Sequence, residues 1–169
     1  VGLVLAVVRR ASLRKDRVKT TGMDYTVIVL FVIIMVSGFL LEGTKISSYS
    51  IYRQMVEDYA TVANQEERKA LEAYWVANFG VVSPAVRGPL PAEVLAKGRE
   101  AHEVSCAPCH SEPQAAFISY PLSRVMKPMA LSMDEAGFPK ALWIIHFMAC
   151  FVGLAYLPFS KMFHIIATP

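Results

Sequence analysis

The sequence predicts an all-α membrane protein, a transmembrane helical bundle with a helical insert on one side of the membrane. Two observations predict this fold class. Of the 169 residues, 54% are hydrophobic, and these gather in three apolar runs at residues 1–8, 25–41 and 141–159. The long segment between the second and third runs is more polar and carries helical patterns. The chain therefore reads as membrane spans separated by an insert.

The second and third runs each predict a membrane-spanning helix. Residues 25–41 contain no charge, and residues 141–159 contain one histidine and no formal charge. Each run approaches the ~20 residues with which a helix crosses a bilayer. A chain of this length has too small a core to hide two helices that are apolar all round, which disfavours a soluble fold.

The first run is too short to span a membrane. It has neither the charged start nor the cleavage site of a signal peptide. We expect it to be the end of a transmembrane helix that begins upstream of Val1, so that the sequence is part of a longer polypeptide.

A basic connector between the first two runs predicts the orientation. It contains six basic residues within residues 9–19, namely Arg9, Arg10, Arg14, Lys15, Arg17 and Lys19. Under the positive-inside rule this connector lies on the cytoplasmic side, and its apolar flanks disfavour a nucleic-acid-binding patch. Residues 42–140 are then expected on the periplasmic, or extracytoplasmic, side of a cytoplasmic membrane that the protein crosses several times.

The insert itself reads as helices joined by a connector. Residues 47–78 predict one or two amphipathic helices that lie on the membrane or cap the bundle, and residues 80–91, with three prolines and two glycines, predict a connector. A further helix is expected to start at Pro91, with Glu93 in its first turn. The expected segments are transmembrane helices and the basic connector at 1–41, a periplasmic helical segment and linker at 42–90, a second insert segment at 91–140, and the last transmembrane helix at 141–169.

One short motif in the insert carries chemistry. Cys106, Cys109 and His110 form C-x-x-C-H, the attachment signature of c-type haem, in which the cysteines form thioethers and the histidine ligates the iron. A redox dithiol would need a βαβ setting. A zinc site would need a second ligand pair, and the one other cysteine, Cys150, lies in the third apolar run. Residues 91–140 are therefore predicted to bind one covalent c-type haem.

The residues before the motif strengthen this prediction. Residues 97–106 resemble the N-terminal helix that leads into the haem motif of small soluble cytochromes c. About 30 residues separate His110 from the third apolar run, which is too few for a complete cytochrome c fold. We therefore expect a minimal insert that packs partly against its neighbours.

The sixth ligand of this haem is open among several residues. Met126, Met129 and Met133 follow the motif, and a thioether opposite the histidine would raise the haem potential. Pro128, directly before Met129, favours Met129 as the metal ligand. His102 is a further candidate, although soluble cytochromes c usually pack a side chain near the haem at that place in the helix.

Two histidines in and after the third apolar run predict further haems. His146 and His164 are 18 residues apart. This spacing is five turns of an α-helix, so both would project from one face about 27 Å apart. Such a geometry suits two b haems stacked across the membrane, whereas the alternative is that each imidazole bridges helices by a hydrogen bond. Pro158 lies between them and is expected to kink the helix.

The residues around this pair resemble a known family. Residues 143–169 resemble the last transmembrane helix of the respiratory nitrate reductase gamma subunit family, which includes the membrane cytochrome b subunits of heterodisulfide-reductase-like and sulfite-reduction complexes. The matching residues are His146, Pro158, Ser160, Lys161, His164 and Pro169. Residues 9–40 are similar to the family's third and fourth helices and their basic connector.

The resemblance implies the later part of a five-helix cytochrome b fold. Two b haems would be held by His146, His164 and histidines of a helix upstream of Val1, and the bundle would exchange electrons with a quinone or quinol. Lys161 would contact a haem propionate, or else extend to the inner membrane surface. The c-haem insert departs from the nitrate reductase pattern, which suggests exchange with a periplasmic monohaem or multihaem cytochrome c.

These features together predict an electron-transfer subunit of a hetero-oligomeric, quinone-linked respiratory complex, with no catalytic side chain of its own. The expected relay joins the c haem, an outer b haem at His146, an inner b haem at His164 and a cytoplasmic iron–sulfur subunit. Membrane lipid is the expected surrounding, and nucleic acid is not an expected partner. The alternative function is a structural c-haem membrane tether without b haems or a quinone site.

Overall fold

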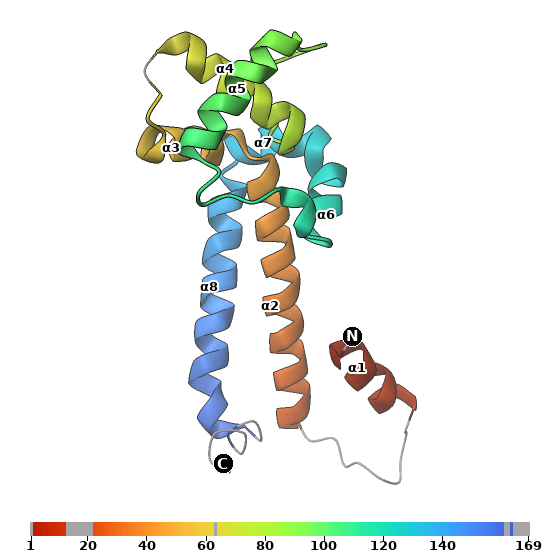
Figure 1. The fold of residues 1–169 in the computed structure, drawn as a ribbon. Helices are drawn as coiled ribbons and strands as arrows, with labels where there is room; N and C mark the ends of the chain where they lie inside the picture. Colours follow the sequence, from red (N-terminus) through yellow and green to blue (C-terminus); the bar gives the residue numbers. More distant parts are fainter. Residues whose placement is uncertain (1, 13–21, 63, 161–162, 164–169) are drawn as a thin grey trace. The chain divides into compact units, whose positions relative to one another are not determined.

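A computed structural model describes residues 2–12, 22–62, 64–160 and 163, and within these ranges it contains helices and no strand (Figure 1). The expected all-α class is thereby confirmed. The α-helices are α1 (Gly2–Ser12), α2 (Gly22–Ser47), α3 (Tyr49–Tyr59), α4 (Gln65–Asn78), α5 (Ala92–Ser105), α6 (Ser119–Met126), α7 (Ala130–Glu135) and α8 (Phe138–Tyr156). The 3-10 helices are η1 (Pro113–Ala115), η2 (Lys127–Met129) and η3 (Leu157–Phe159).

The chain divides into two compact units. The span unit comprises Val1–Gly38 and Leu142–Pro169, and the insert unit comprises Phe39–Ala141. Helices α2 and α8 each belong to both units, because their ranges cross these boundaries. The unit boundaries lie within three residues of the membrane boundaries expected at 41 and 141, whereas the expected segments 42–90 and 91–140 form a single unit.

Among the described residues, two helices are long and apolar enough to cross a membrane, judged by length and composition. They are Gly22–Ser47, with 26 residues, and Phe138–Phe159, with 22 residues including the turn η3. Large apolar side chains in their span-unit portions, such as Val29 and Phe151, are more than half exposed. Apolar surface of this kind requires a cover of lipid or further protein. The chain thus has two possible membrane-spanning helices, which agrees in part with the expected membrane location.

Small residues allow α2 and α8 to pack closely within the span unit. A Cβ atom at Gly153 would lie 3.3 Å from a methyl carbon of Leu30, and a Cβ atom at Gly38 would lie 3.1 Å from His146 Cε1. Close approach at small residues is typical of helix pairs in membranes, where hydrophobic burial does not drive association.

The regular helix of α8 ends at Tyr156, two residues before Pro158. The next three residues form the 3-10 turn η3, and Ser160 is extended, with φ −108° and ψ 163°. Proline lacks a backbone N–H, and its ring clashes with the preceding helical turn, which explains why the helix stops here. The structure therefore shows a helix end where the sequence predicts a kink.

Residues 47–78 form two helices, in agreement with the sequence, and each starts at a side-chain cap. Ser48 Oγ accepts a hydrogen bond from Ile51 N at 3.2 Å at the start of α3. Asn64 Oδ1 accepts one from Glu67 N at 2.8 Å at the start of α4. These caps satisfy backbone N–H groups that the first helical turn leaves unpaired.

Residues 80–91 contain no helix, as expected for a connector. Gly80 adopts φ +89°, a left-handed conformation that glycine tolerates, and Val82 N donates to Ser47 O at 3.0 Å. Pro91 is the N-cap of α5, so this helix starts one residue later than expected, with Glu93 in its first turn.

Two carboxylates fix other parts of the insert unit. Asp134 accepts from Ser48 Oγ at 2.6 Å and from Ser50 N at 2.8 Å, which joins α7 to the start of α3. Glu42 accepts from Ser119 Oγ at 2.5 Å, which joins α2 to the start of α6. Hydrogen bonds to a charged acceptor are stronger than neutral ones, so these contacts hold the start of α3 and the start of α6 in place.

The core of the insert unit forms where α4 packs on α5. A Cβ atom at Gly98 would lie 2.1 Å from Ala70 O, so the two helix backbones are in direct contact. The buried core residues come from α3, α4, α5 and the segments that follow them: Tyr52, Val56, Leu71, Trp75, Phe79, Val81, Ala101 and Cys106. Helices α3 and α4 thus share one core with the C-x-x-C-H motif.

Candidate functional site

The C-x-x-C-H motif lies at the end of α5. Cys106 is the C-cap, and its N–H donates to His102 O at 2.8 Å. The N–H groups of Cys109 and His110 both donate back to Cys106 O, at 3.1 and 2.9 Å. This tight turn holds the three motif residues together, with Cys106 buried and the other two exposed. Neither cysteine forms a disulfide within the described residues.

Two cavities of the insert unit meet at the motif. Their volumes are about 580 Å³ and about 270 Å³. Cys109, His110 and Met55 line both cavities, and Cys106 also lines the smaller one. The larger cavity falls within the ~300–1,000 Å³ that is usual for small-molecule and cofactor sites. The motif therefore borders space for a group much larger than a metal ion.

Aromatic rings form one wall of the larger cavity. Trp75 and Phe79 stack with their centroids 4.3 Å apart, and Tyr52 of α3 packs on Trp75 at 5.6 Å. The Trp75 ring also meets the His110 imidazole edge-on at 5.6 Å. This wall gives the cavity the mostly apolar, aromatic lining that is typical of cofactor sites.

Two buried polar atoms near the motif have no hydrogen-bond partner among the described residues, Trp75 Nε1 and His102 Nδ1. Buried polar groups are normally paired. Trp75 lines the larger cavity, so a bound group with an acceptor atom would satisfy its N–H. His102 is enclosed by the rings of Phe79 and Tyr74, at 4.8 and 5.3 Å. This burial lowers the pKa of His102, and the nearby His110 lowers it further.

Burial also changes the chemistry of Cys106. It raises the pKa of the thiol. A reactive dithiol or a zinc thiolate requires a lowered thiol pKa, whereas a thioether carries no charge and suits a buried sulfur. Among the described residues, no group of three or more His, Cys, Asp and Glu side chains is placed to hold a metal ion. The motif, the cavities and the buried sulfur fit a covalently attached haem better than either alternative.

The methionines expected from the sequence lie away from these cavities. Met129 is 60% exposed in η2, and neither it nor Met126 nor Met133 lines either cavity. His102 does not line them either, and all four ligand roles stay predictions. Met55 of α3 lines both cavities but precedes the motif in the chain, so a search downstream of the motif misses it.

In the span unit, His146 of α8 is held by a side chain of α2. Its Nδ1 lies 3.0 Å from Ser37 Oγ, and Ser37 donates its own proton to Ile34 O at 3.2 Å. In the arrangement where the hydroxyl proton goes to Ile34 O, Nδ1–H is the donor to Ser37 and Nε2 keeps a lone pair. Nε2 lies 3.7 Å from Cys150 Sγ, one turn along α8. Metal-ligating histidines are commonly oriented by such a bond at the other ring nitrogen.

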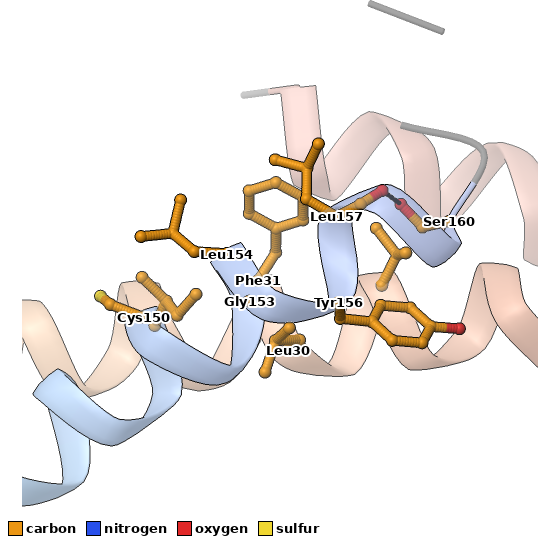
Figure 2. A pocket seen from close by; sticks show the side chains of 10 residues that line it. Leu30, Phe31, Cys150, Gly153, Leu154, Tyr156, Leu157 and Ser160 are labelled. Atoms are coloured by element: carbon orange, nitrogen blue, oxygen red, sulfur yellow. Dashed lines mark hydrogen bonds between the residues drawn. The ribbon is translucent and has the colours of Figure 1, made fainter. Parts of the chain in front are cut away.

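An apolar groove of about 350 Å³ lies between α2 and the end of α8. Figure 2 shows its lining, which includes Leu30 and Phe31 from α2 and Leu154 from α8. Cys150, the neighbour of His146, also lines it. The aliphatic and aromatic lining suits an apolar occupant.

Two expected site residues, Lys161 and His164, lie outside the described residues. The regular helix that would place His164 on the same face as His146 ends at Tyr156, so a spacing of 18 residues no longer fixes their relation. The roles of Lys161 and His164 stay predictions.

Comparisons with known proteins identify no relative of this chain. No protein-family model, no curated protein and no solved structure matches the chain. The resemblance to the nitrate reductase gamma subunit family therefore stays a prediction from the residues quoted for it.

Proposed function

We propose that this chain is a membrane electron-transfer subunit that carries one covalent c-type haem at Cys106, Cys109 and His110. The observation that supports this most strongly is the meeting of two cavities at these residues. A C-x-x-C-H sequence that arose by chance in a surface turn would need no such space, whereas an attached haem would occupy it.

The haem supplies one-electron chemistry when it is bound, and the chain holds and surrounds it. Cys106 and Cys109 would hold the haem through thioether bonds to its vinyl groups, and His110 would ligate its iron through an imidazole nitrogen. Trp75 and Phe79 keep water from one side of the cavity, and such a hydrophobic shell tunes the reduction potential of a metal site.

The proposal includes a b haem in the span unit, with His146 as a ligand. The Ser37 hydrogen bond fixes the ring and leaves the Nε2 lone pair available for iron in place of its weak contact with the Cys150 thiol. As the family resemblance implies, His164 would ligate a second b haem, Lys161 would contact a propionate, and further histidines would complete the ligand sets. Electrons would then pass among the haems, a quinone or quinol, an extracytoplasmic cytochrome c and a cytoplasmic iron–sulfur subunit.

The proposed location is the cytoplasmic membrane. Two possible spans, Gly22–Ser47 and Phe138–Phe159, flank the central insert in the sequence. A segment between two consecutive crossings lies on one side of the membrane, and the basic residues before α2 assign the opposite, cytoplasmic side by the positive-inside rule. The haem motif is then extracytoplasmic, where c haems are attached.

A specific contact favours a second function, a c-haem membrane tether without b haems or a quinone site. Both ring nitrogens of His146 already have neighbours, Ser37 at Nδ1 and Cys150 at Nε2. In this function the imidazole only joins α8 to α2 through Ser37, by a hydrogen bond of a kind that contributes about 0.6 kcal/mol in membrane proteins.

The haem content of the chain, purified in detergent within its own complex, distinguishes these functions. The proposal predicts that the chain stains for haem on a denaturing gel and that a pyridine haemochrome spectrum contains both c-type and b-type haem. Cys106→Ala with Cys109→Ala should remove the covalent haem alone, and His146→Leu should remove b haem alone. Covalent haem without b haem in an intact complex supports the tether, and a wild-type chain without covalent haem contradicts both functions.

A further inference from the structure

We infer that Met55 is the second axial ligand of the c haem, alongside His110. This inference rests on the proposed function, since it requires haem at the motif. It assigns the ligand to α3, which precedes the motif in the chain, and not to the methionines that follow it.

The cavity lining is the first observation that supports Met55. Three residues line both cavities at the motif, Cys109, His110 and Met55. Two of them belong to the motif itself. Among the residues that line these cavities, Met55 is therefore the one outside the motif that borders both of the spaces available to an attached group.

The donor atom of Met55 is the second observation. The other lining side chains that carry hydroxyl, carboxylate or ammonium groups are Glu42, Lys45, Tyr52, Tyr59, Ser105, Ser111 and Glu112. A thioether binds haem iron opposite histidine and carries no proton that must first be lost. An ammonium group must lose a proton before it can bind a metal. Among the lining residues, Met55 thus carries the donor best suited to this position.

The firm position of α3 is the third observation. Tyr52 lies one turn before Met55, and Val56 lies directly after it. Both belong to the core, where they are 5% and 6% exposed. Met55 is partly buried and packs against that core. The start of the helix is fixed by its Ser48 cap and by Asp134. A ligand on a helix held in this way is presented with little conformational freedom, as a metal site requires.

Met129, the ligand that the sequence favours, is the natural matched control. It lies in the 3-10 turn η2 with 60% of its surface exposed and borders neither cavity. The same substitution at both positions removes one thioether from the chain in each case. The two residues therefore differ in their place relative to the motif and not in chemistry.

The experiment compares Met55→Leu with Met129→Leu in the full chain with covalent haem attached. Met55→Leu should keep the haem stain on a denaturing gel. It should lose the charge-transfer absorption band of ferric haem with a thioether ligand, bind carbon monoxide readily when reduced, and show a lower reduction potential. Met129→Leu should keep the wild-type spectrum and potential. Met55→His should give a six-coordinate, low-spin haem without the thioether band.

The outcomes separate this inference from the proposed function. Loss of the thioether band in Met129→Leu, its retention in Met55→Leu, or its absence from the haem-loaded wild type overturns the assignment of Met55 and leaves the covalent haem in place. A wild-type chain without covalent haem overturns the proposed function instead. If Met55→Leu does not load haem, Met55→His decides: a low-spin spectrum without the thioether band supports the assignment, and a retained band contradicts it.

Discussion

The insert unit buries a core of large apolar side chains, whereas many large apolar side chains of the span unit are exposed. Leu71 and Trp75 of the insert unit are 0% and 7% exposed, whereas Phe151 and Leu154 of the span unit are 59% and 69% exposed. Both units are helical. The insert unit therefore carries its own core, whereas the span unit requires apolar surroundings from lipid or from other helices.

A glycine-to-alanine substitution should change the stability of the two units by the most different amounts. In α5, a Cβ atom at Gly98 would lie 2.1 Å from Ala70 O, and a backbone carbonyl cannot move without parting α4 from α5. We expect Gly98→Ala to destabilise the insert unit by at least the ~1–3 kcal/mol of core overpacking. In α8, a Cβ atom at Gly153 would meet only flexible ends of side chains such as Leu30, at 3.3 Å, and Gly153→Ala should be nearly neutral.

Thermal unfolding of the two glycine variants, followed by circular dichroism in detergent, checks this expectation. Gly98→Ala should melt at a clearly lower temperature than the wild type, and Gly153→Ala should melt with it. Equal melting temperatures for all three proteins would show that the close contact of α4 and α5 does not limit stability.

A charged residue introduced into each unit tests whether the exposed apolar surface of α8 lies in a membrane. Met148 of α8 and Val125 of α6 are 48% and 76% exposed. If α8 spans a membrane, Met148→Arg should raise the free energy of insertion by about 2.5–3.5 kcal/mol. Val125→Arg adds the same side chain to the insert unit, where water can solvate it, and should have little effect. The measurement is the fraction of each variant that stays in membranes after alkaline extraction, and equal retention would contradict a spanning α8.

The features that the sequence predicts well are those set by neighbouring residues. The apolar runs become α2 and α8 because hydropathy is a property of a continuous stretch, and Pro91 and Glu93 mark the start of α5 within one residue. The spacing of Cys106, Cys109 and His110 is local as well. Each of these features depends on backbone or side-chain preferences that need no distant partner.

The features that the sequence misses depend on contacts between distant segments. Met55 and Trp75 reach the motif only because α3 and α4 pack on α5, and nothing in the local sequence of either residue indicates this contact. The pairing of Ser37 with His146 likewise needs α2 beside α8. Helix α8 ends at Tyr156, before Pro158, where the sequence predicts a kink, because proline permits either outcome and the surrounding structure selects one.

One histidine from each unit extends the comparison. His146 of the span unit has a partner at each ring nitrogen. Ser37→Ala removes the acceptor that orients it, and we expect a ~10–100-fold loss of b-haem affinity, as for other changes that unfix a metal-binding histidine. Thr26→Ala on the same helix is the control, since the Thr26 hydroxyl bonds Gly22 O of its own helix. The ratio of b-type to c-type haem in the purified complex measures the effect, and an unchanged ratio would favour the tether.

A substitution of His102 in the insert unit has the smallest expected effect on stability. Its Nδ1 is buried without a partner among the described residues, inside a box of aromatic rings. Phenylalanine fills the same space without a polar atom, so His102→Phe should stabilise the unit by about 1 kcal/mol at neutral pH. Chemical unfolding followed by circular dichroism measures the difference.

The pH dependence of that difference tests the cause. Burial lowers the pKa of His102 in the folded protein, below the value of about 6.5 expected for the unfolded chain. The unfolded chain therefore takes up a proton first as the pH falls, so the wild-type protein loses stability from about pH 6.5 down to the lowered folded pKa. His102→Phe lacks this loss, and its advantage over the wild type should grow between about pH 7.5 and about pH 5.5. A constant advantage would mean that the imidazole accepts a proton as readily in the folded protein as in the unfolded chain, and that its aromatic box does not exclude charge.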